Sequence, residues 1–171
     1  MKELKAKIRD IVDFPIPGII YKDITPLLQD SSSLKLSVSE LAKPFKNTAI
    51  SAVAGMEARG FIFGSLVAAE LNVGFIPLRK PGKLPHQVES VSYSLEYGEA
   101  TLEAHIDAIN KGDKILVVDD VLATGGTAKA SCELIEKLGG EIVACAFVIE
   151  LSILNGREQL DDTPIHSLIS Y

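Results

Sequence analysis

The chain has 171 residues, a length that predicts one folded domain over 1–171. Its 47% hydrophobic and 23% charged residues argue against a disordered protein. With 17 basic and 23 acidic residues the net charge is −6, and we expect no nucleic-acid partner, because a phosphate backbone requires a basic surface.

The first half of the chain is predicted to contain helices and buried strands in alternation. Apolar residues at helical spacing predict a helix over 2–12, and the prolines after Phe14 break it. Asp30 and the serines that follow it are N-cap residues for a helix that runs through about Ala42. A buried strand, an apolar helix and a second strand are then predicted over 49–55, 58–71 and 73–78.

The second half continues this alternation. Period-two polarity predicts a half-exposed strand over 90–96, followed by a helix over 99–110. The apolar, β-branched run 114–118 is typical of a central parallel strand. A helix from Thr127 to Leu138 and a buried strand over 142–149 follow. We therefore expect an α/β fold with a mostly parallel sheet, whose ligands bind beyond the carboxyl ends of the strands.

The strongest motif is the segment 117–127, VVDDVLATGGT, in which a buried strand leads into a loop of small residues and a helix. Free N–H groups and the helix dipole make such a loop a phosphate site, here formed by Ala123, Thr124, Gly125, Gly126 and Thr127. Asp119 and Asp120 would repel a phosphate. We therefore expect them to face ribose hydroxyls, or Mg²⁺ with its waters.

This segment resembles the PRPP (phosphoribosyl pyrophosphate) motif of the type I phosphoribosyltransferase family. Four other segments are similar to the adenine-specific branch of that family and appear in its order: 14–26 (FPIPGIIYKDITP), 57–64 (EARGFIFG), 78–85 (LRKPGKLP) and 92–98 (SYSLEYG). The resemblance covers essentially the whole chain. It implies the type I phosphoribosyltransferase fold, with helices flanking a mostly parallel sheet and an N-terminal hood, residues 1–30, over the base.

The resemblance also implies an enzyme of purine salvage, a glycosyltransferase that makes AMP and pyrophosphate from PRPP and adenine. In that reaction N9 of adenine attacks C1 of PRPP. Mg²⁺ would arrive with PRPP and lie near Asp119 and Asp120 through water, with no direct protein ligand. Residues Ala123 to Thr127 would bind the 5′-phosphate and the two aspartates the ribose, which is the division that the residues themselves suggest.

Pyrophosphate binding is implied for four basic residues, Arg59, Arg79, Lys80 and Lys83. The resemblance places Arg59 after a non-proline cis peptide bond, here Glu57–Ala58. It also implies a homodimer, in which Arg79 reaches across the interface.

Base binding is implied for the hood. Backbone groups of Ile20 and Lys22 would read adenine, whose N6 donates and whose N1 accepts. Tyr21 would pack on one face of the ring and Val121 on the other.

The candidate catalytic residues are Glu96 and Arg59. Glu96 and Tyr97 fall in the segment that resembles the mobile catalytic loop of the family. Adenine N9 must lose a proton as it attacks, and a closed, dry loop could raise the pKa of the Glu96 carboxyl toward neutrality. The three histidines, His86, His105 and His166, show no pairing pattern and are interpreted as structural or surface residues.

Two alternatives remain open: a phosphoribosyltransferase for another purine, and a non-catalytic PRPP-binding regulator. Such a regulator needs a DNA-binding region, and no basic recognition helix is visible.

Three features predict the cytoplasm. Cys132 and Cys145 lack the spacing of a disulfide framework or a zinc site, which fits a reducing compartment. The charged N-terminal decapeptide does not resemble a signal peptide. The apolar stretch 60–78 is interrupted by polar residues and Pro77, so no membrane partner is expected.

Charge is distributed unevenly along the chain. Residues 1–88 hold 12 basic and 8 acidic residues, whereas 89–171 hold 5 basic and 15 acidic ones. The basic half contains the implied pyrophosphate residues, and the acidic half contains the loop that would bind the 5′-phosphate through neutral donors.

Overall fold

The computed structural model describes residues 1–94 and 98–171. Its centre is a five-stranded sheet in the order β4-β3-β7-β8-β9, and every neighbouring pair in it is parallel. The strands are β3 (Ala52–Met56), β4 (Gly74–Leu78), β7 (Lys114–Leu122), β8 (Glu141–Glu150) and β9 (Ile165–Ser170). Because all five run the same way, their carboxyl ends share one edge of the sheet. The expected α/β fold with a mostly parallel sheet is confirmed.

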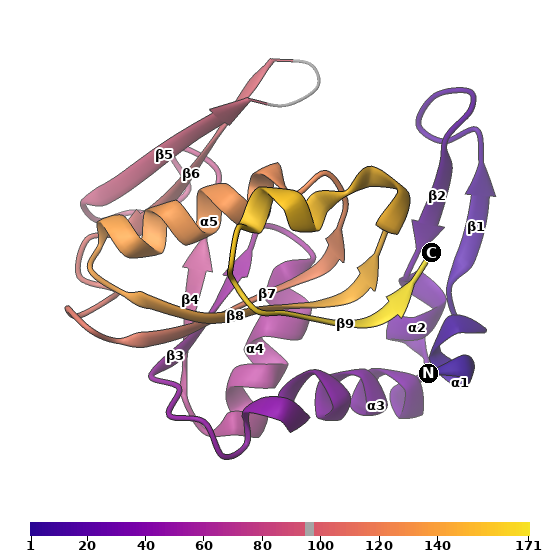
Figure 1. Ribbon diagram of the computed structural model, residues 1–171, viewed down its shortest axis with the longest axis horizontal. Coiled ribbons are helices and arrows are strands. Elements are labelled where there is room, and N and C mark those ends of the chain that lie inside the picture. Colours follow the sequence, from indigo (N-terminus) through magenta and orange to yellow (C-terminus); the bar gives the residue numbers. More distant parts are fainter. Residues whose placement is uncertain (95–97) are drawn as a thin grey trace.

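Helices cover both faces of the sheet (Figure 1). α3 (Ser31–Ala42) and α4 (Gly60–Leu71) pack on one face, and α5 (Gly126–Lys137) packs on the other. Shorter helical segments connect these layers: α1 (Lys2–Lys5), α2 (Thr25–Gln29), and the 3₁₀ turns η1 (Lys43–Phe45), η2 (Ser152–Leu154) and η3 (Gly156–Leu160). Within the described residues, no helix is both long enough and apolar enough to cross a bilayer.

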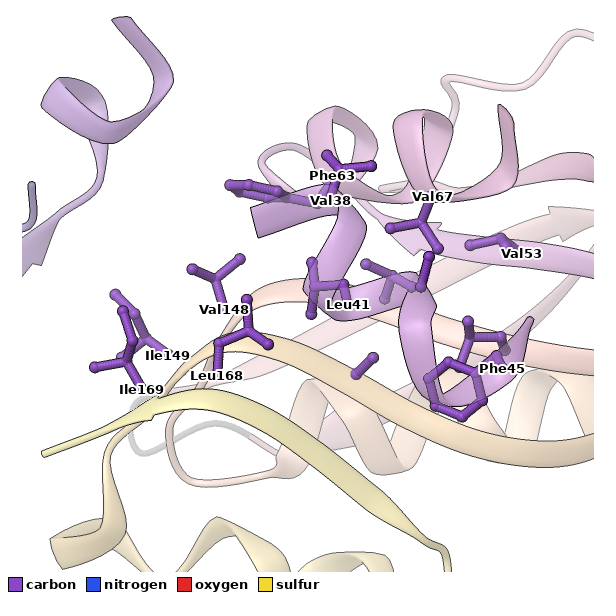
Figure 2. Packing of buried hydrophobic residues seen from close by; sticks show 14 of the residues in the cluster. Val38, Leu41, Phe45, Val53, Phe63, Val67, Val148, Ile149, Leu168 and Ile169 are labelled. Carbon is purple, nitrogen blue, oxygen red and sulfur yellow. The ribbon is translucent and has the colours of Figure 1, made fainter. Parts of the chain in front are cut away.

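Alternate residues of the central strands build two cores. Leu116 and Val118 of β7 belong to the core beneath α3 and α4, while Ile115 and Val117 belong to the core beneath α5. Figure 2 shows the first core, where Phe63 on α4 lies among side chains from several elements. Each such fully buried side chain contributes about 1.5–3 kcal/mol. A strand buried on both faces reads as a continuous apolar run, which is why the sequence predicts β7 and β8 well.

Two antiparallel ribbons stand at opposite ends of the sheet (Figure 1). One pairs β1 (Arg9–Val12) with β2 (Ile20–Asp23), and the other pairs β5 (Val88–Ser94) with β6 (Glu99–His105). The helix predicted over 2–12 is therefore wrong beyond Lys5. Arg9 to Val12 pair with β2 instead, supported by the cross-strand ion pair of the Arg9 guanidinium with Asp23, 2.7 Å.

The helix predicted over 99–110 is also wrong. Residues Glu99–His105 form β6, which pairs with β5 along its whole length and buries Leu102 and Ala104 on one side, and residues 106–110 follow as a turn. The Ser92 and Thr101 hydroxyls meet across the ribbon at 2.8 Å. Helix-forming glutamates and alanines yield here to cross-strand pairing, since a weak local preference is routinely overridden by tertiary contacts.

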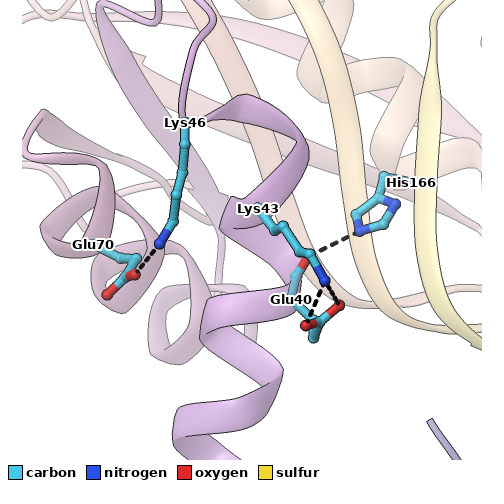
Figure 3. A network of polar contacts seen from close by, with 5 residues as sticks. All are labelled: Glu40, Lys43, Lys46, Glu70 and His166. Carbon is cyan, nitrogen blue, oxygen red and sulfur yellow. Dashed lines mark hydrogen bonds and ion pairs between the residues drawn. The ribbon is translucent and has the colours of Figure 1, made fainter.

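Other local expectations are confirmed. The Asp30 carboxylate accepts the backbone N–H of Ser33 at 2.8 Å and caps α3, which ends at Ala42. Figure 3 shows that His166 is structural, because its Nε2 donates to the carbonyl oxygen of Glu40 at 3.0 Å. Cys132 and Cys145 are buried free thiols.

Candidate active site

A cavity of about 340 Å³ opens at the carboxyl edge of the sheet. Its walls come from the β2 ribbon, the start of α4, the β7–α5 loop and the end of β8. The lining residues are Ile19, Ile20, Tyr21, Lys22, Arg59, Asp119, Asp120, Val121, Leu122, Ala123, Thr124, Gly125, Thr127, Ala128, Phe147 and Leu151. Parts of the chain that are about 100 residues apart in sequence thus meet where a parallel sheet places its ligands.

The β7–α5 loop leads into the N-terminus of α5. α5 begins at Gly126, so the N–H groups of the preceding loop point out of a twelve-residue helix N-terminus. Gly125 adopts φ 87°, a left-handed conformation that favours glycine, and a Cβ there would collide with the backbone oxygen of Gly156. The Thr127 hydroxyl lies 3.1 Å from the Tyr93 hydroxyl of β5. The loop and the first turn of α5 are thus contacted from two sides, and Ala123, Thr124 and Gly125 line the cavity.

Two carboxylates share the rim with this loop. Asp120 is only 3% exposed, and Arg59 Nε donates to its Oδ2 at 2.5 Å. Gly60 lets the start of α4 approach β7 closely, because a Cβ at that position would lie 2.8 Å from Asp119 Oδ1. Asp119 accepts the backbone N–H of Asp120 at 2.8 Å. Burial, together with the neighbouring Asp120 charge, raises the pKa of the Asp119 carboxyl well above its usual range.

The β1–β2 ribbon supplies an aromatic wall. The Tyr21 ring lies edge-on to Phe14, with centroids 5.3 Å apart, and the Arg59 guanidinium lies 5.8 Å from its centroid. The Lys22 side chain is only 13% exposed, since its ammonium donates to Asp10 at 2.7 Å and lies over the Tyr171 ring. The Lys22 charge is therefore held by the ribbon itself.

Arg79, Lys80 and Lys83 do not line this cavity within the part of the chain that the structure describes. Glu57 links their segment to the start of α4. Its carboxylate accepts hydrogen bonds from the guanidinium of Arg79 at 3.3 Å and from the backbone N–H of Lys80 at 3.0 Å. These hydrogen bonds, that of Lys80 above all, lower the pKa of Glu57. The Glu57–Ala58 peptide bond is cis, as the resemblance implied.

Two sequence candidates remain, Gly126 and Glu96. Gly126 heads α5 behind the loop. Glu96, the candidate acid/base, lies outside the described residues, as does Tyr97.

Comparison with known proteins agrees with this geometry. A family model described as the phosphoribosyl transferase domain matches residues 21–166. The adenine phosphoribosyltransferase of Nitrosococcus oceani is 64% identical over 171 residues, covering 100% of both chains. The chain belongs to the adenine phosphoribosyltransferase family. It is accordingly a glycosyltransferase-type enzyme of purine salvage.

Solved structures of adenine phosphoribosyltransferases share the fold. That of Thermoanaerobacter pseudethanolicus superposes with a TM-score of 0.96 at 48% identity and covers 99% of each chain. That of Saccharomyces cerevisiae, complexed with D-2,5-dideoxy-2,5-imino-altritol 1,6-bisphosphate and adenine, superposes with a TM-score of 0.93 at 36% identity. The match covers 98% of this chain and 97% of the yeast one.

Several residues that line the cavity were not among the candidates predicted from the sequence. Leu151 follows β8 just as the aspartates follow β7, so the strand-end rule could have found it. Ile19 adjoins the candidate Ile20 in the hood. Leu122 lies within the predicted motif without being singled out, and Phe147 and Ala128 sit in a predicted strand and helix that read as core.

The residues that line the cavity also indicate how Mg²⁺ could be held there. Among the described residues, no group of three His, Cys, Asp or Glu side chains gathers that could hold a metal ion. Asp119 and Asp120 are hard oxygen donors beside the anion loop, which fits an ion carried mainly by substrate phosphates and water.

Proposed function

We propose that this chain joins adenine to PRPP by attack of N9 on C1, with inversion, and releases AMP and pyrophosphate. The observation that carries the proposal is the meeting, in one cavity, of a helix N-terminal loop, two carboxylates and an aromatic wall. These are the donors that a phosphate, a ribose and a purine require, in the order in which PRPP and adenine present them.

PRPP binds with its 5′-phosphate on the loop from Ala123 to Thr127. The loop offers neutral N–H and hydroxyl donors, which suit an anion next to two aspartates. Asp119 and Asp120 then accept hydrogen bonds from the ribose hydroxyls. Because Arg59 pairs with Asp120, the sugar site and the start of α4 are already tied together before substrate arrives.

Adenine binds between Tyr21 and Val121. Backbone groups of Ile20 and Lys22 read its N6 and N1 edges, and the engagement of the Lys22 ammonium by Asp10 and Tyr171 supports this role. A backbone carbonyl accepts from N6, and a backbone N–H donates to N1.

The leaving pyrophosphate is met by cations. Arg59 on the rim offsets the developing charge of the pyrophosphate. Glu57, two residues before Arg59, holds the segment of Arg79, Lys80 and Lys83 nearby through hydrogen bonds from Arg79 and Lys80. Bound Mg²⁺ would supply further charge neutralisation to the pyrophosphate. Glu96 accepts the proton that N9 loses, a role proposed from the sequence alone.

The wider setting follows from the family resemblance and the charge. We expect one domain over 1–171, with a hood over about 1–30, that acts as a cytoplasmic homodimer without nucleic-acid or membrane partners. Light scattering on purified protein measures its oligomeric state directly.

The test of the site is the double variant Asp119→Asn with Asp120→Asn. It should abolish PRPP binding, measured by calorimetry, and AMP formation, measured by chromatography, because both ribose acceptors lose their charge. The matched control, Asp107→Asn with Asp162→Asn, makes the same change in net charge at exposed positions outside the cavity. Full activity in the first variant would remove the basis of the proposal.

A further inference from the structure

The loop proposed for the 5′-phosphate rests on a second backbone segment. Gly156, the first residue of η3, is buried against it. A Cβ at Gly156 would collide with the carbonyl oxygen of Ala123, and a Cβ at Gly125 would collide with the carbonyl oxygen of Gly156. The two backbones therefore touch with no side chain between them, and the position of Gly156 fixes the position of the loop.

An ion pair between the half-exposed Arg157 and the buried Glu150 fastens the residue next to Gly156. Arg157 donates through Nε to Glu150 Oε1 at 2.5 Å and through Nη2 to Oε2 at 2.7 Å. Glu150 is only 7% exposed and ends β8, directly opposite Leu122 in the β7–β8 register. Ala123 follows Leu122 in the chain. The pair thus ties η3 to the same sheet edge from which the loop departs.

The geometry of the pair suits a positioning role. Two parallel N–H···O bonds fix both the distance and the direction of the guanidinium, which a single contact would not do. Arg157 lowers the pKa of the Glu150 carboxyl, so the pair stays ionised at neutral pH. Because the guanidinium is half exposed, the pair contributes little net stability, but its two parallel bonds fix the direction of Arg157 relative to the end of β8. The pairs Lys43–Glu40 and Lys46–Glu70 in Figure 3 use a lysine ammonium, a point charge that fixes no such direction.

We propose that Glu150 and Arg157 are positioning residues for the 5′-phosphate loop: their ion pair holds Gly156 against Ala123 and Gly125 and so sets the direction of the loop N–H groups. The inference rests on the proposed function of that loop. The aromatic wall of the base site is held by a different element, the β1–β2 ribbon, where the Tyr21 ring lies edge-on to Phe14. Loss of the pair should therefore weaken phosphate-bearing ligands and spare adenine.

The experiment compares AMP and adenine as calorimetric probes of the full chain. Arg157→Met keeps an unbranched apolar stem and removes the guanidinium donors. It should weaken AMP binding about tenfold or more and raise the KM for PRPP similarly, because small misplacements of binding groups are costly. The dissociation constant of adenine should stay within about twofold of wild type. Arg157→Lys, which keeps the charge but not the fork, should fall between the two.

A stability control separates positioning from unfolding. Val38→Ala creates a small cavity in the core beneath α3, away from the site, and lowers the thermal midpoint without changing the ratio of AMP to adenine affinity. If Arg157→Met does not fold, Arg157→Lys supplies the comparison.

The possible outcomes distinguish failure of this inference from failure of the proposed function. Unchanged AMP affinity in the Arg157 variants, or equal losses for AMP and adenine, would overturn the inference while leaving the proposed function intact. Failure of the wild-type chain to bind AMP would overturn the proposed function, and this inference with it.

Discussion

At the scale of single residues, the two neighbouring aspartates differ in environment. The Asp120 carboxylate forms an ion pair with Arg59, whose Nε donates to it at 2.5 Å. The Asp119 carboxylate accepts the backbone N–H of Asp120, and burial with the charge of Asp120 raises its pKa. The fold thus disfavours the charged form of a carboxyl to which a bound ribose would donate hydrogen bonds. Such local conflict is typical of functional positions.

This difference predicts a stabilising substitution. Because the folded state holds the Asp119 proton more tightly than the unfolded chain, ionisation at neutral pH costs stability that Asp119→Asn would restore. The variant should melt at a higher temperature than wild type at pH 7. The gap should narrow as the pH falls toward about 4, where the unfolded carboxyl also binds its proton. Calorimetric scans across this pH range measure it.

Asp23 provides a control of opposite sign. Hydrogen bonds from Thr25 and then Arg9 lower its pKa to about 2, so its charge stabilises the fold. Asp23→Asn should lower the thermal midpoint at pH 7, and the loss should fade as the pH falls through about 4 toward 2. A lower midpoint in Asp119→Asn at every pH would contradict the account of Asp119.

At the scale of elements, the glycines at 125 and 156 allow the β7–α5 loop to lie against η3. Gly125 and Gly112 both adopt a positive φ, near 87° and 84°, but only Gly125 has backbone against it. Gly112→Ala meets nothing within 4 Å and should cost only the backbone term, about 1–2 kcal/mol.

Gly125→Ala should be more destabilising than Gly112→Ala, because the new methyl group must displace the Gly156 carbonyl. It should also weaken AMP binding, whereas Gly112→Ala should not. Urea unfolding and calorimetry measure the two effects. Equal stability losses in both variants, with equal AMP affinity, would show that the contact with Gly156 is unimportant.

Elements also show what the sequence can and cannot predict. β7 and β8 are buried on both faces and read as apolar runs, so they and the adjoining aspartate–glycine motif were predicted directly. The ribbons β1–β2 and β5–β6 are hairpins with one open face, and one strand of each was misread as helix. The segments misread as helix carry lysines or glutamates that favour a helix, and cross-strand pairing overrides this preference.

Within the site, residues close together in the chain were easier to predict than residues far apart. The loop residues from Asp119 to Thr127 are contiguous, so local chemistry identifies them. Arg59 meets Asp120 across 61 positions, and only the family resemblance pointed to that region. Gly156 and Arg157 follow the last predicted strand and carry no motif, so their place behind the loop emerges only from the fold.

At the scale of the whole molecule, the uneven charge acquires a spatial meaning. The acidic half of the chain supplies the loop and the two aspartates, and the basic half supplies Arg59 and the segment of Lys80 and Lys83. The parallel sheet brings both halves to one edge, where Arg59 bridges to Asp120. An acidic protein can thus hold a polyanionic substrate, because its phosphates meet neutral donors at one end and cations at the other.

The most direct measurement offers PRPP and Mg²⁺ with adenine, hypoxanthine, guanine or xanthine, and quantifies nucleotide and pyrophosphate. We expect AMP and pyrophosphate in equal amounts from adenine. The 6-oxopurines should react with a kcat/KM at least about 100-fold lower, since they carry an acceptor where N6 donates. Comparable turnover of another purine, or PRPP binding without product from any base, would contradict the central claim.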